Sequence, residues 1–506
     1  MLLIIIVLLG AFLRFYKLGE TSFNSDEFLD INSSFAYAQT GVWQNWDFNF
    51  EKVNSDNIFE ARDERAWIYK GQVAQLLKVF PPTESVARTV SVFWGIISII
   101  LIFFVAKYFS KKNEVALISS FLFAISVSGI IFDRTLRMYA MFFAVFLAFS
   151  WFLFKFLEEE YKGKNKFIKY FWDKAELNLV YFIPMVVMGI VSLLTHQLTA
   201  NILFIFLFYA IIQVGLKIKN KKSYFDKYFF GLLVMLVGYV SGLIFMPERL
   251  NKYSKELDFF KDHFSYLGKV FSDYNNAILA VIFLALGIYY LCKKQKLQKE
   301  SAWLATSFLG TLFLAIFIWD RNAGDQYIFF IQSFGIILIA SGIYYAAIYL
   351  KENMAANKDK VFLSVIILAL VLLPNYGYFI QNENTYHQTS QSDNPDFRKI
   401  FSYFKKAREP QDVLISRKVR NYYWGGEKVK LFDFGGELAE EKLSLDQLKK
   451  ITTENPSGWF IYTDNDESYI ANDAITYAEK NFEKVSNVKV RGKVSVYRWG
   501  HINNEN

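Results

Sequence analysis

Residues 86–106, VARTVSVFWGIISIILIFFVA, decide the fold class, because this apolar run is long enough to cross a membrane. A transmembrane helix needs about 20 predominantly apolar residues to cross a hydrocarbon core of roughly 30 Å. Ten further runs follow the same pattern, at 2–16, 115–132, 138–154, 178–195, 198–216, 228–247, 276–292, 302–319, 327–350 and 361–380. The sequence therefore predicts a polytopic α-helical membrane protein with about eleven transmembrane helices.

The composition indicates that a polar part accompanies these runs. Of the 506 residues 53% are hydrophobic and 21% are charged, and a mean hydropathy of +0.19 is too low for lipid-embedded helices alone. The formal net charge of +8 is of the sign that attracts nucleic acid. We nevertheless expect no nucleic-acid partner, because the lysines lie in short links between the apolar runs, where positive charge sets membrane topology. The single cysteine, Cys292, allows no internal disulfide.

The lysine-rich links also predict the orientation. They follow the second, fourth, sixth, eighth and tenth runs, and the positive-inside rule places all five in the cytoplasm. The N-terminus is then cytoplasmic, and the region after the eleventh run is extracytoplasmic, as expected for a multi-pass protein of the plasma membrane. Arg14 and Lys17, at the outer end of the first run, point the other way, but five concordant links outweigh one helix.

Three segments on the outer side offer room for chemistry: a first loop at 17–85, a second at about 248–275, and the C-terminal region. In the last, alternating segments at 413–415, 429–432, 459–462 and 494–497 predict strands, and stretches at 397–406, 443–451 and 470–481 predict helices. We expect a transmembrane domain, 1–380, which includes the first loop, and a small extracytoplasmic α/β domain, 381–506.

The first loop opens with residues 23–28, FNSDEF, directly after the first run. Asn24 or Ser25 would cap a helix that begins there, which places Asp26 and Glu27 in its first turn, where the helix dipole favours an ionised carboxylate. Such an acid just above the bilayer is a candidate general base for a hydroxyl nucleophile. The alternative is that both acids merely suit a helix start.

Further polar residues fall at predicted span ends on the same side. Arg134 and Arg137 are three residues apart, so on a helix they would share a face, and arginine binds phosphate bidentately. Snorkelling, or an Asp133–Arg137 pair, is the alternative. Arg321 is another arginine on this side.

Two residues of this side are acceptor or metal candidates. Glu64 could orient an acceptor or hold a metal, unless it only pairs with a neighbouring arginine. His196 could join it, although two ligands make a thin site for a divalent ion, and a lone histidine is more often structural.

With these residues in place, the chain resembles membrane glycosyltransferases of the GT-C fold, in the branch of protein O-mannosyltransferases and the lipid A aminoarabinose transferase. The matching motifs are RFYKLG at 14–19 leading into Ser25-Asp26-Glu27, ESVAR at 84–88, RTLRMY at 134–139 and Thr195-His196. The oligosaccharyltransferases of the same fold class carry a WWDYG motif, whereas the nearest string here, YYWGG at 422–426, lacks the acid.

This resemblance implies transfer of one sugar from a polyprenyl-phosphate carrier to a lipid, glycan or protein acceptor, with inversion at the anomeric carbon. Asp26 matches the presumed base of the family. Arg134, Arg137 and Arg321 would neutralise the leaving phosphate, and Gln326 stands where relatives often have arginine. Glu64 lies where aminoarabinose transferases keep a metal-binding glutamate, which leaves a divalent cofactor open.

Two other classes remain to be weighed. A lipid or glycolipid transporter or flippase should carry its ionisable groups near the middle of the membrane, between broken helices, whereas these spans have almost uncharged centres. A non-catalytic relic of the glycosyltransferase fold is the other alternative, which the intact Asp26 disfavours. Only an assay decides between them.

Overall fold

The computed structural model describes residues 1–53, 65–246, 248, 261–320, 324–354, 358–387, 395–434, 442–485 and 494–500. The chain divides into two compact units. Unit 1 consists of residues 1–15, 66–69 and 91–378, and unit 2 of residues 16–65, 70–90 and 379–506. The first-loop residues therefore group with the C-terminal region, whereas the sequence analysis assigned them to the transmembrane domain.

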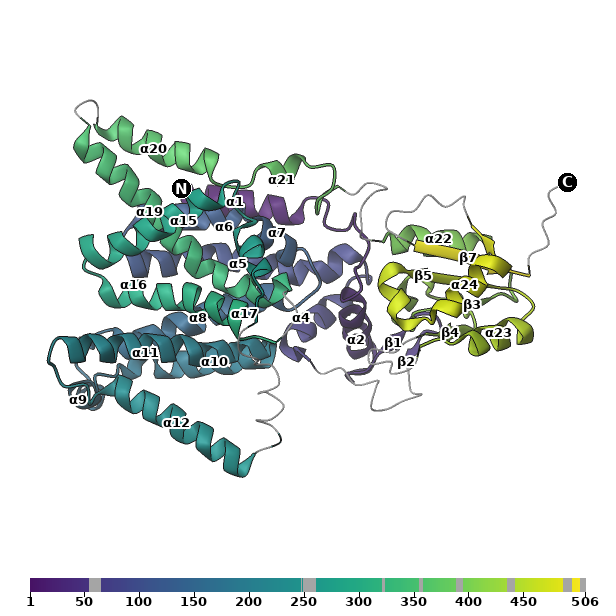
Figure 1. Cartoon of the computed structure of the whole chain (residues 1–506), viewed down its shortest axis with the longest axis horizontal. Coiled ribbons are helices and arrows are strands. Elements are labelled where there is room, and N and C mark those ends of the chain that lie inside the picture. The colour runs from purple at the N-terminus through teal and green to yellow at the C-terminus, as the bar shows by residue number, and fades with distance from the viewer. Residues whose placement is uncertain are drawn as a thin grey trace. The chain divides into compact units, whose positions relative to one another are not determined.

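Unit 1 is helical (Figure 1). Helix α5 (Glu84–Ser110) begins in unit 2 and continues into unit 1, and α4 (Trp67–Leu77) also belongs to both. The other helices are α1 (Leu2–Phe15), α6 (Asn113–Ala124), α7 (Val127–Asp133), α8 (Tyr139–Glu158), α9 (Lys166–Ala175), η1 (Leu179–Tyr181), α10 (Phe182–Thr195), η2 (Gln197–Ala200), α11 (Asn201–Lys219), α12 (Lys227–Phe245), α14 (Ser265–Phe271), α15 (Ala277–Tyr289), η3 (Tyr290–Lys294), α16 (Gln298–Ala305), η4 (Thr306–Gly310), α17 (Thr311–Phe317), α18 (Asp325–Ile328), η5 (Phe329–Ile331), α19 (Gln332–Asn353) and α20 (Lys358–Leu372).

Among the described residues, seven to nine of the eleven predicted runs have the length of a membrane span. Among the described residues seven helices pass by length and composition: Glu84–Ser110, Tyr139–Glu158, Gln197–Lys219, Lys227–Phe245, Ala277–Lys294, Gln298–Phe317 and Asp325–Asn353. Two bent pairs, α6 with α7 and α9 with η1–α10, bring the number to nine if each pair is one span. The runs at 2–16 and 361–380 form α1 and α20, of 14 and 15 residues. At about 1.5 Å per residue, these are shorter than the hydrocarbon core.

Helices α15 and α19 pack closely enough to require glycine at two positions. A Cβ atom added at Gly287 would lie 1.9 Å from the Leu338 carbonyl oxygen, and one at Gly342 would lie 1.8 Å from that of Phe283. Small residues let helix backbones approach in a membrane, where packing rather than water exclusion drives association. In the 18-residue apolar window of the span that contains α19, 94% of the residues are buried, so this helix lies at the centre of unit 1.

Unit 2 contains a small mixed sheet with strands in the order β4-β3-β5-β7-β6 (Figure 1). The strands are β3 (Val413–Ser416), β4 (Leu431–Asp433), β5 (Gly458–Thr463), β6 (Glu483–Lys484) and β7 (Val494–Trp499). Strand β3 pairs in parallel with β4 and β5, and β7 pairs antiparallel with β5 and β6. In register, Leu414 lies beside Trp459 and Phe460 beside Tyr497. The predicted C-terminal α/β fold is confirmed.

Helices cover both faces of this sheet because strand side chains alternate between faces. Phe460 packs in one cluster with Leu448 of α23 (Leu445–Glu454) and Ala474 of α24 (Asn472–Asn481). Trp459, which points to the other face, contacts Phe404 of α22 (Phe397–Ala407) with ring centroids 5.7 Å apart. Short helices α21 (Gly377–Ile380), η6 (Lys418–Trp424) and η7 (Asp464–Tyr469) complete the C-terminal part.

The first loop supplies the rest of unit 2. Helix α2 (Glu27–Thr40) ends at Gly41, whose φ of 74° is easily reached only without a side chain, and strands β1 (Trp46–Asp47) and β2 (Lys52–Val53) form a hairpin. Asn49 exchanges two hydrogen bonds with the backbone of Val429, at 2.9 and 3.0 Å. Such bonds join loop and C-terminal region, which explains why they form one unit.

Candidate functional site

Asp26 stands exposed at the N-terminus of α2. The Asn24 Oδ1 atom accepts the backbone N–H groups of Asp26 and Glu27, each at 3.1 Å. Asn24 therefore bonds the turn that enters α2, but the N-cap position itself is Asp26, whose side chain makes no capping bond. The carboxylate therefore sits where unsatisfied N–H groups and the helix dipole stabilise negative charge, in reach of solvent.

The neighbouring acid, Glu27, is 1% exposed and bound to Arg88 of α5. The Arg88 Nε and Nη2 atoms donate to its two oxygens at 2.8 and 2.7 Å, and the Asn24 N–H donates at 2.9 Å. Arg88 also donates to backbone oxygens of Leu18, Thr21 and Ser22. This set of bonds fixes the segment 18–27, so its geometry favours a positioning role for Glu27 beside Asp26.

A second network ties residues far along the chain to the same segment. Arg398 of α22 donates to the Glu84 carboxylate at 2.6 and 3.0 Å and to the Gly19 carbonyl at 2.8 Å. The Tyr423 hydroxyl donates to Glu84 at 2.9 Å and accepts the Phe23 N–H at 2.7 Å. C-terminal side chains therefore hold the stretch that leads into Asp26.

The charges of this network reinforce each other. Burial alone would lower the pKa of the Arg398 guanidinium, but the Glu84 carboxylate outweighs it and raises that pKa. Burial, followed by the charge of Glu84, raises the pKa of the Tyr423 hydroxyl well above its ordinary value. Arg398 therefore stays charged and Tyr423 stays a hydrogen-bond donor at neutral pH.

Arg134 and Arg137 do not lie on a helix, so the shared-face prediction is corrected. Helix α7 ends at Asp133 and α8 begins at Tyr139, with a turn between them. Arg134 is 4% exposed, and its Nη1 donates to the Arg14 carbonyl at 2.8 Å, where α1 ends. Arg137 is half-buried, with its guanidinium 5.8 Å from the centre of the Tyr139 ring. Arg134 thus caps a helix, and phosphate binding stays a prediction for both.

The alternative pair of Asp133 with Arg137 is replaced by a pair with Arg14. The Arg14 Nε donates to the Asp133 Oδ2 at 2.7 Å, and both side chains are buried. The remaining Arg14 donors contact the carbonyls of Gly10, Phe123 and Ala124. This pair joins α1 to the bent pair α6–α7, at a place in unit 1 where the helices break.

His196 caps a helix turn. It is 9% exposed, its Nδ1 accepts the Leu198 N–H at 3.0 Å, and its ring lies beside Tyr139 and Phe142. A metal at His196 would therefore have to bind through Nε2. Within the described part of the chain no group of three or more His, Cys, Asp and Glu residues could hold a metal ion. Glu64 and Arg321 lie outside the described residues.

Sequence reasoning did not assign roles to Arg88, Glu84, Arg398 and Tyr423. One signal was present, since Arg88 is the only charge in the run at 86–106, and a charge in an apolar span calls for a buried partner. The partner, Glu27, is 61 residues away in sequence, and Glu84 and Arg398 are 314 apart. Pairs this distant have no local pattern.

Solved structures resemble this chain over nearly its whole length. ArnT from Cupriavidus metallidurans bound to undecaprenyl phosphate is 11% identical, with a TM-score of 0.58 over 98% of this chain and 97% of that one. The Archaeoglobus fulgidus oligosaccharyltransferase in the apo form is 11% identical, with a TM-score of 0.61 over 96% and 72%. The oligosaccharyltransferase AglB of that organism, in complex with an inhibitory peptide and a dolichol-phosphate, is 10% identical, with a TM-score of 0.60 over 96% and 72%.

These likenesses confirm the GT-C fold that the sequence motifs suggested. The sequence comparisons add less. A family model described as phosphatidylinositolglycan class N (PIG-N) matches residues 264–404, well under half of the chain. No curated protein matches the sequence. The chain is a multi-pass membrane protein with the fold of ArnT and of the AglB oligosaccharyltransferase.

Proposed function

We propose that this chain is an inverting glycosyltransferase that moves one sugar from a polyprenyl-phosphate carrier to a lipid, glycan or protein acceptor. The observation that carries the proposal is the exposed Asp26 carboxylate at the N-terminus of α2, held by the buried Glu27–Arg88 pair. Support comes from the fold, since ArnT and AglB were solved with undecaprenyl phosphate and a dolichol-phosphate, respectively. By the positive-inside rule the reaction takes place at the outer face of the plasma membrane.

In this proposal Asp26 takes the proton of an acceptor hydroxyl. The hydroxyl oxygen attacks the anomeric carbon from the face opposite the phosphate, and the bond to the phosphate oxygen breaks with its electron pair on the lipid phosphate. Attack from that face inverts the anomeric configuration. Arg134, Arg137 and Arg321 are the proposed partners of the leaving phosphate, an electrostatic stabilisation. Arg134 also holds the end of α1.

A transfer assay tests the role of Asp26. Protein purified in detergent is incubated with radiolabelled polyprenyl-phosphate sugars and a membrane extract that supplies acceptors. We expect Asp26→Asn to lower the rate by about 10²- to 10⁴-fold, the usual contribution of a general base. Glu20→Gln is the matched control, because Glu20 is an exposed acid of the same segment paired only to Lys17 among the described residues, and it should transfer at the wild-type rate.

The same assay separates the other classes. Transfer by wild type that Asp26→Asn leaves unchanged would remove the proposed base. Failure of the wild type to transfer from every donor in the panel would contradict the enzyme and favour a transporter, flippase or inactive relic. We further propose that a divalent ion at Glu64 or His196 assists the transfer. Loss of transfer on chelation, restored by added metal, would support this.

A further inference from the structure

A cavity of about 500 Å³ lies in unit 1, and none of the residues assigned to sugar transfer lines it. Three chain segments line it: the end of α5 with Tyr108 and Lys111, residues 155–162 at and after the end of α8, and residues 178–181 at the start of η1. These are ends that border lysine-rich links, which the positive-inside rule assigns to the cytoplasm. The cavity therefore belongs to the level of lipid headgroups.

Two lysines that line the cavity share an aromatic neighbour. The Lys111 ammonium lies 4.0 Å from the centre of the Tyr108 ring, and the Lys155 ammonium lies 5.1 Å from the same ring and 4.2 Å from that of Tyr181. Lys155 also pairs with Glu159 at 3.4 Å. The carboxylate charges of Glu300 and Glu159 act on the Lys111 ammonium, although no ion pair of Lys111 is found among the described residues. Two ammonium groups that share one ring repel each other, so an anion there would be stabilised.

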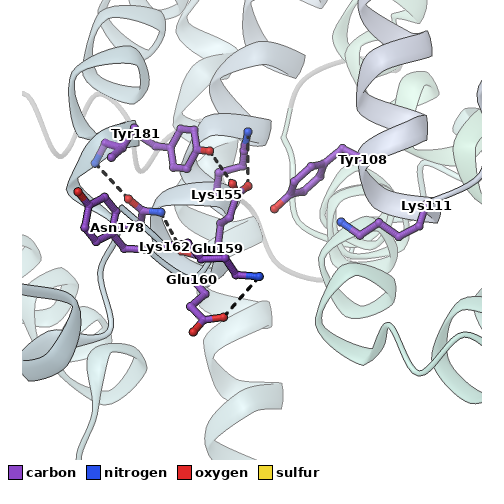
Figure 2. A pocket seen from close by; sticks show the side chains of 10 residues that line it. Tyr108, Lys111, Lys155, Glu159, Glu160, Lys162, Asn178 and Tyr181 are labelled. Atoms are coloured by element: carbon purple, nitrogen blue, oxygen red, sulfur yellow. Dashed lines mark hydrogen bonds and ion pairs between the residues drawn. The ribbon is translucent and has the colours of Figure 1, made fainter. Parts of the chain in front are cut away.

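Carboxylates line the same cavity, and Glu159 lies beside Lys155 rather than across from it (Figure 2). Glu159 already has two partners inside the protein, because it accepts a hydrogen bond from the Tyr181 hydroxyl at 2.6 Å and pairs with Lys155. Glu160 pairs only loosely with Lys162, at 3.8 Å, and these side chains are 64% and 81% exposed. Exposed ion pairs contribute about 0 to 1 kcal/mol, so a ligand cation could replace Lys162 at Glu160 with little loss.

We propose that this pocket binds a membrane phospholipid headgroup that carries a phosphate and a primary ammonium, with the phosphate at Lys111 and Lys155 and the ammonium at Glu160. The volume suits a headgroup with part of its glycerol, since ligand pockets span about 300 to 1,000 Å³. A purely anionic headgroup would face Glu159 and Glu160. A quaternary ammonium prefers aromatic faces, which here already hold lysines. The site is independent of the proposed sugar transfer.

Native mass spectrometry of the full chain in detergent tests this with short-chain phosphatidylethanolamine, phosphatidylglycerol and phosphatidylcholine. Wild type should bind the phosphatidylethanolamine most tightly. Lys111→Ala should weaken it about tenfold, as expected for loss of one charge-assisted contact. Lys111→Arg should keep most of the affinity, and Lys222→Ala, an exposed lysine outside the pocket, should keep all of it.

The ammonium contact and the phosphate contact should have different effects on lipid affinity. Glu160→Gln should weaken the phosphatidylethanolamine several-fold and leave phosphatidylglycerol unchanged or tighter, because only the ammonium contact is removed. Equal binding of all three lipids, or no effect of Lys111→Ala in a variant whose lipid-free melting temperature is unchanged, would overturn the proposal. Soluble phosphoethanolamine should compete only at much higher concentration, and equal potency would overturn the assignment to a membrane lipid.

Discussion

Two buried arginine–carboxylate pairs, one in each unit, support helix ends in different ways. In unit 2 the Arg88–Glu27 pair uses both carboxylate oxygens, at 2.8 and 2.7 Å. In unit 1 the Arg14–Asp133 pair has one contact, at 2.7 Å. The Asp133 Oδ1 is buried with no hydrogen-bond partner among the described residues. A buried pair is favourable only when hydrogen bonds offset its desolvation, so the pair beside Asp26 is the better built.

This difference indicates what each pair is for. In the Arg88–Glu27 pair, Arg88 also donates to three backbone oxygens in residues 18–22. The pair therefore fixes the segment that leads into the exposed Asp26. The Arg14–Asp133 pair binds carbonyls of α1 and of α6, so it joins helices that break inside unit 1. One pair therefore holds the segment before the proposed base, and the other joins α1 to α6 and α7.

The largest expected effect comes from Glu27→Gln. This change removes the partner of a buried guanidinium and should lower the free energy of unfolding by about 4 kcal/mol, measured by chemical denaturation in detergent. Asp466→Asn is the matched control, because it breaks another buried bidentate pair of unit 2, with Arg420, both contacts at 2.7 Å.

The two variants should separate in kinetics. If Glu27 positions Asp26, then Glu27→Gln should lower kcat with little change in KM, whereas Asp466→Asn should lose stability and keep kcat. Equal kcat values in the two variants would show that the Arg88–Glu27 pair is only structural.

A smaller loss is expected for Asp133→Asn. Only one charge-assisted bond is weakened, and such bonds contribute about 1.5 to 3 kcal/mol, so unfolding should become easier by about 2 kcal/mol. Transfer by the remaining folded protein should be unchanged. A loss as large as that of Glu27→Gln would mean that the difference in bonding between the two pairs does not matter.

An effect similar to that of Asp133→Asn is expected from Gly95→Ala in α5, and the smallest from its control, Gly215→Ala. The added Cβ would lie 2.3 Å from the Asp133 Oδ2 and 2.8 Å from the Arg14 Nε, so the pair must shift, and overpacking of this kind costs about 1 to 3 kcal/mol. Gly215→Ala in α11, with nothing within 4 Å of the new Cβ, should instead be neutral or stabilising. Melting temperatures of the two variants in detergent make the comparison.

The sequence predicted those parts of the molecule that local pattern determines. Apolar runs of span length, alternating strands such as 459–462 and the helix start at Asn24 all leave a signal within a few residues, and the structure contains them. The bend between α6 and α7 was not predicted. There Ser126 and Ser128 donate to the buried Asp273, about 145 residues further along the chain.

The candidate site was predicted in the same uneven way. Asp26 was found because helix starts have a local signature. The buried position of Glu27 depends on Arg88, which is 61 residues away in sequence. The grouping of the first loop with the C-terminal region depends on Arg398 and Tyr423, whose partners in the first loop lie up to 400 residues away in sequence. Deleting the C-terminal region would therefore also remove the contacts that hold residues 19–23 before Asp26. Point substitutions are thus the better test of what the C-terminal region does.

The stereochemistry of transfer tests the central claim most directly. The purified chain is given polyprenyl-phosphate sugars of known anomeric configuration with a membrane extract, and the configuration of the product is determined by NMR. The account predicts an inverted product in wild type and at least about a hundredfold less of it in Asp26→Asn. A product with retained configuration, or full transfer by Asp26→Asn, would contradict it.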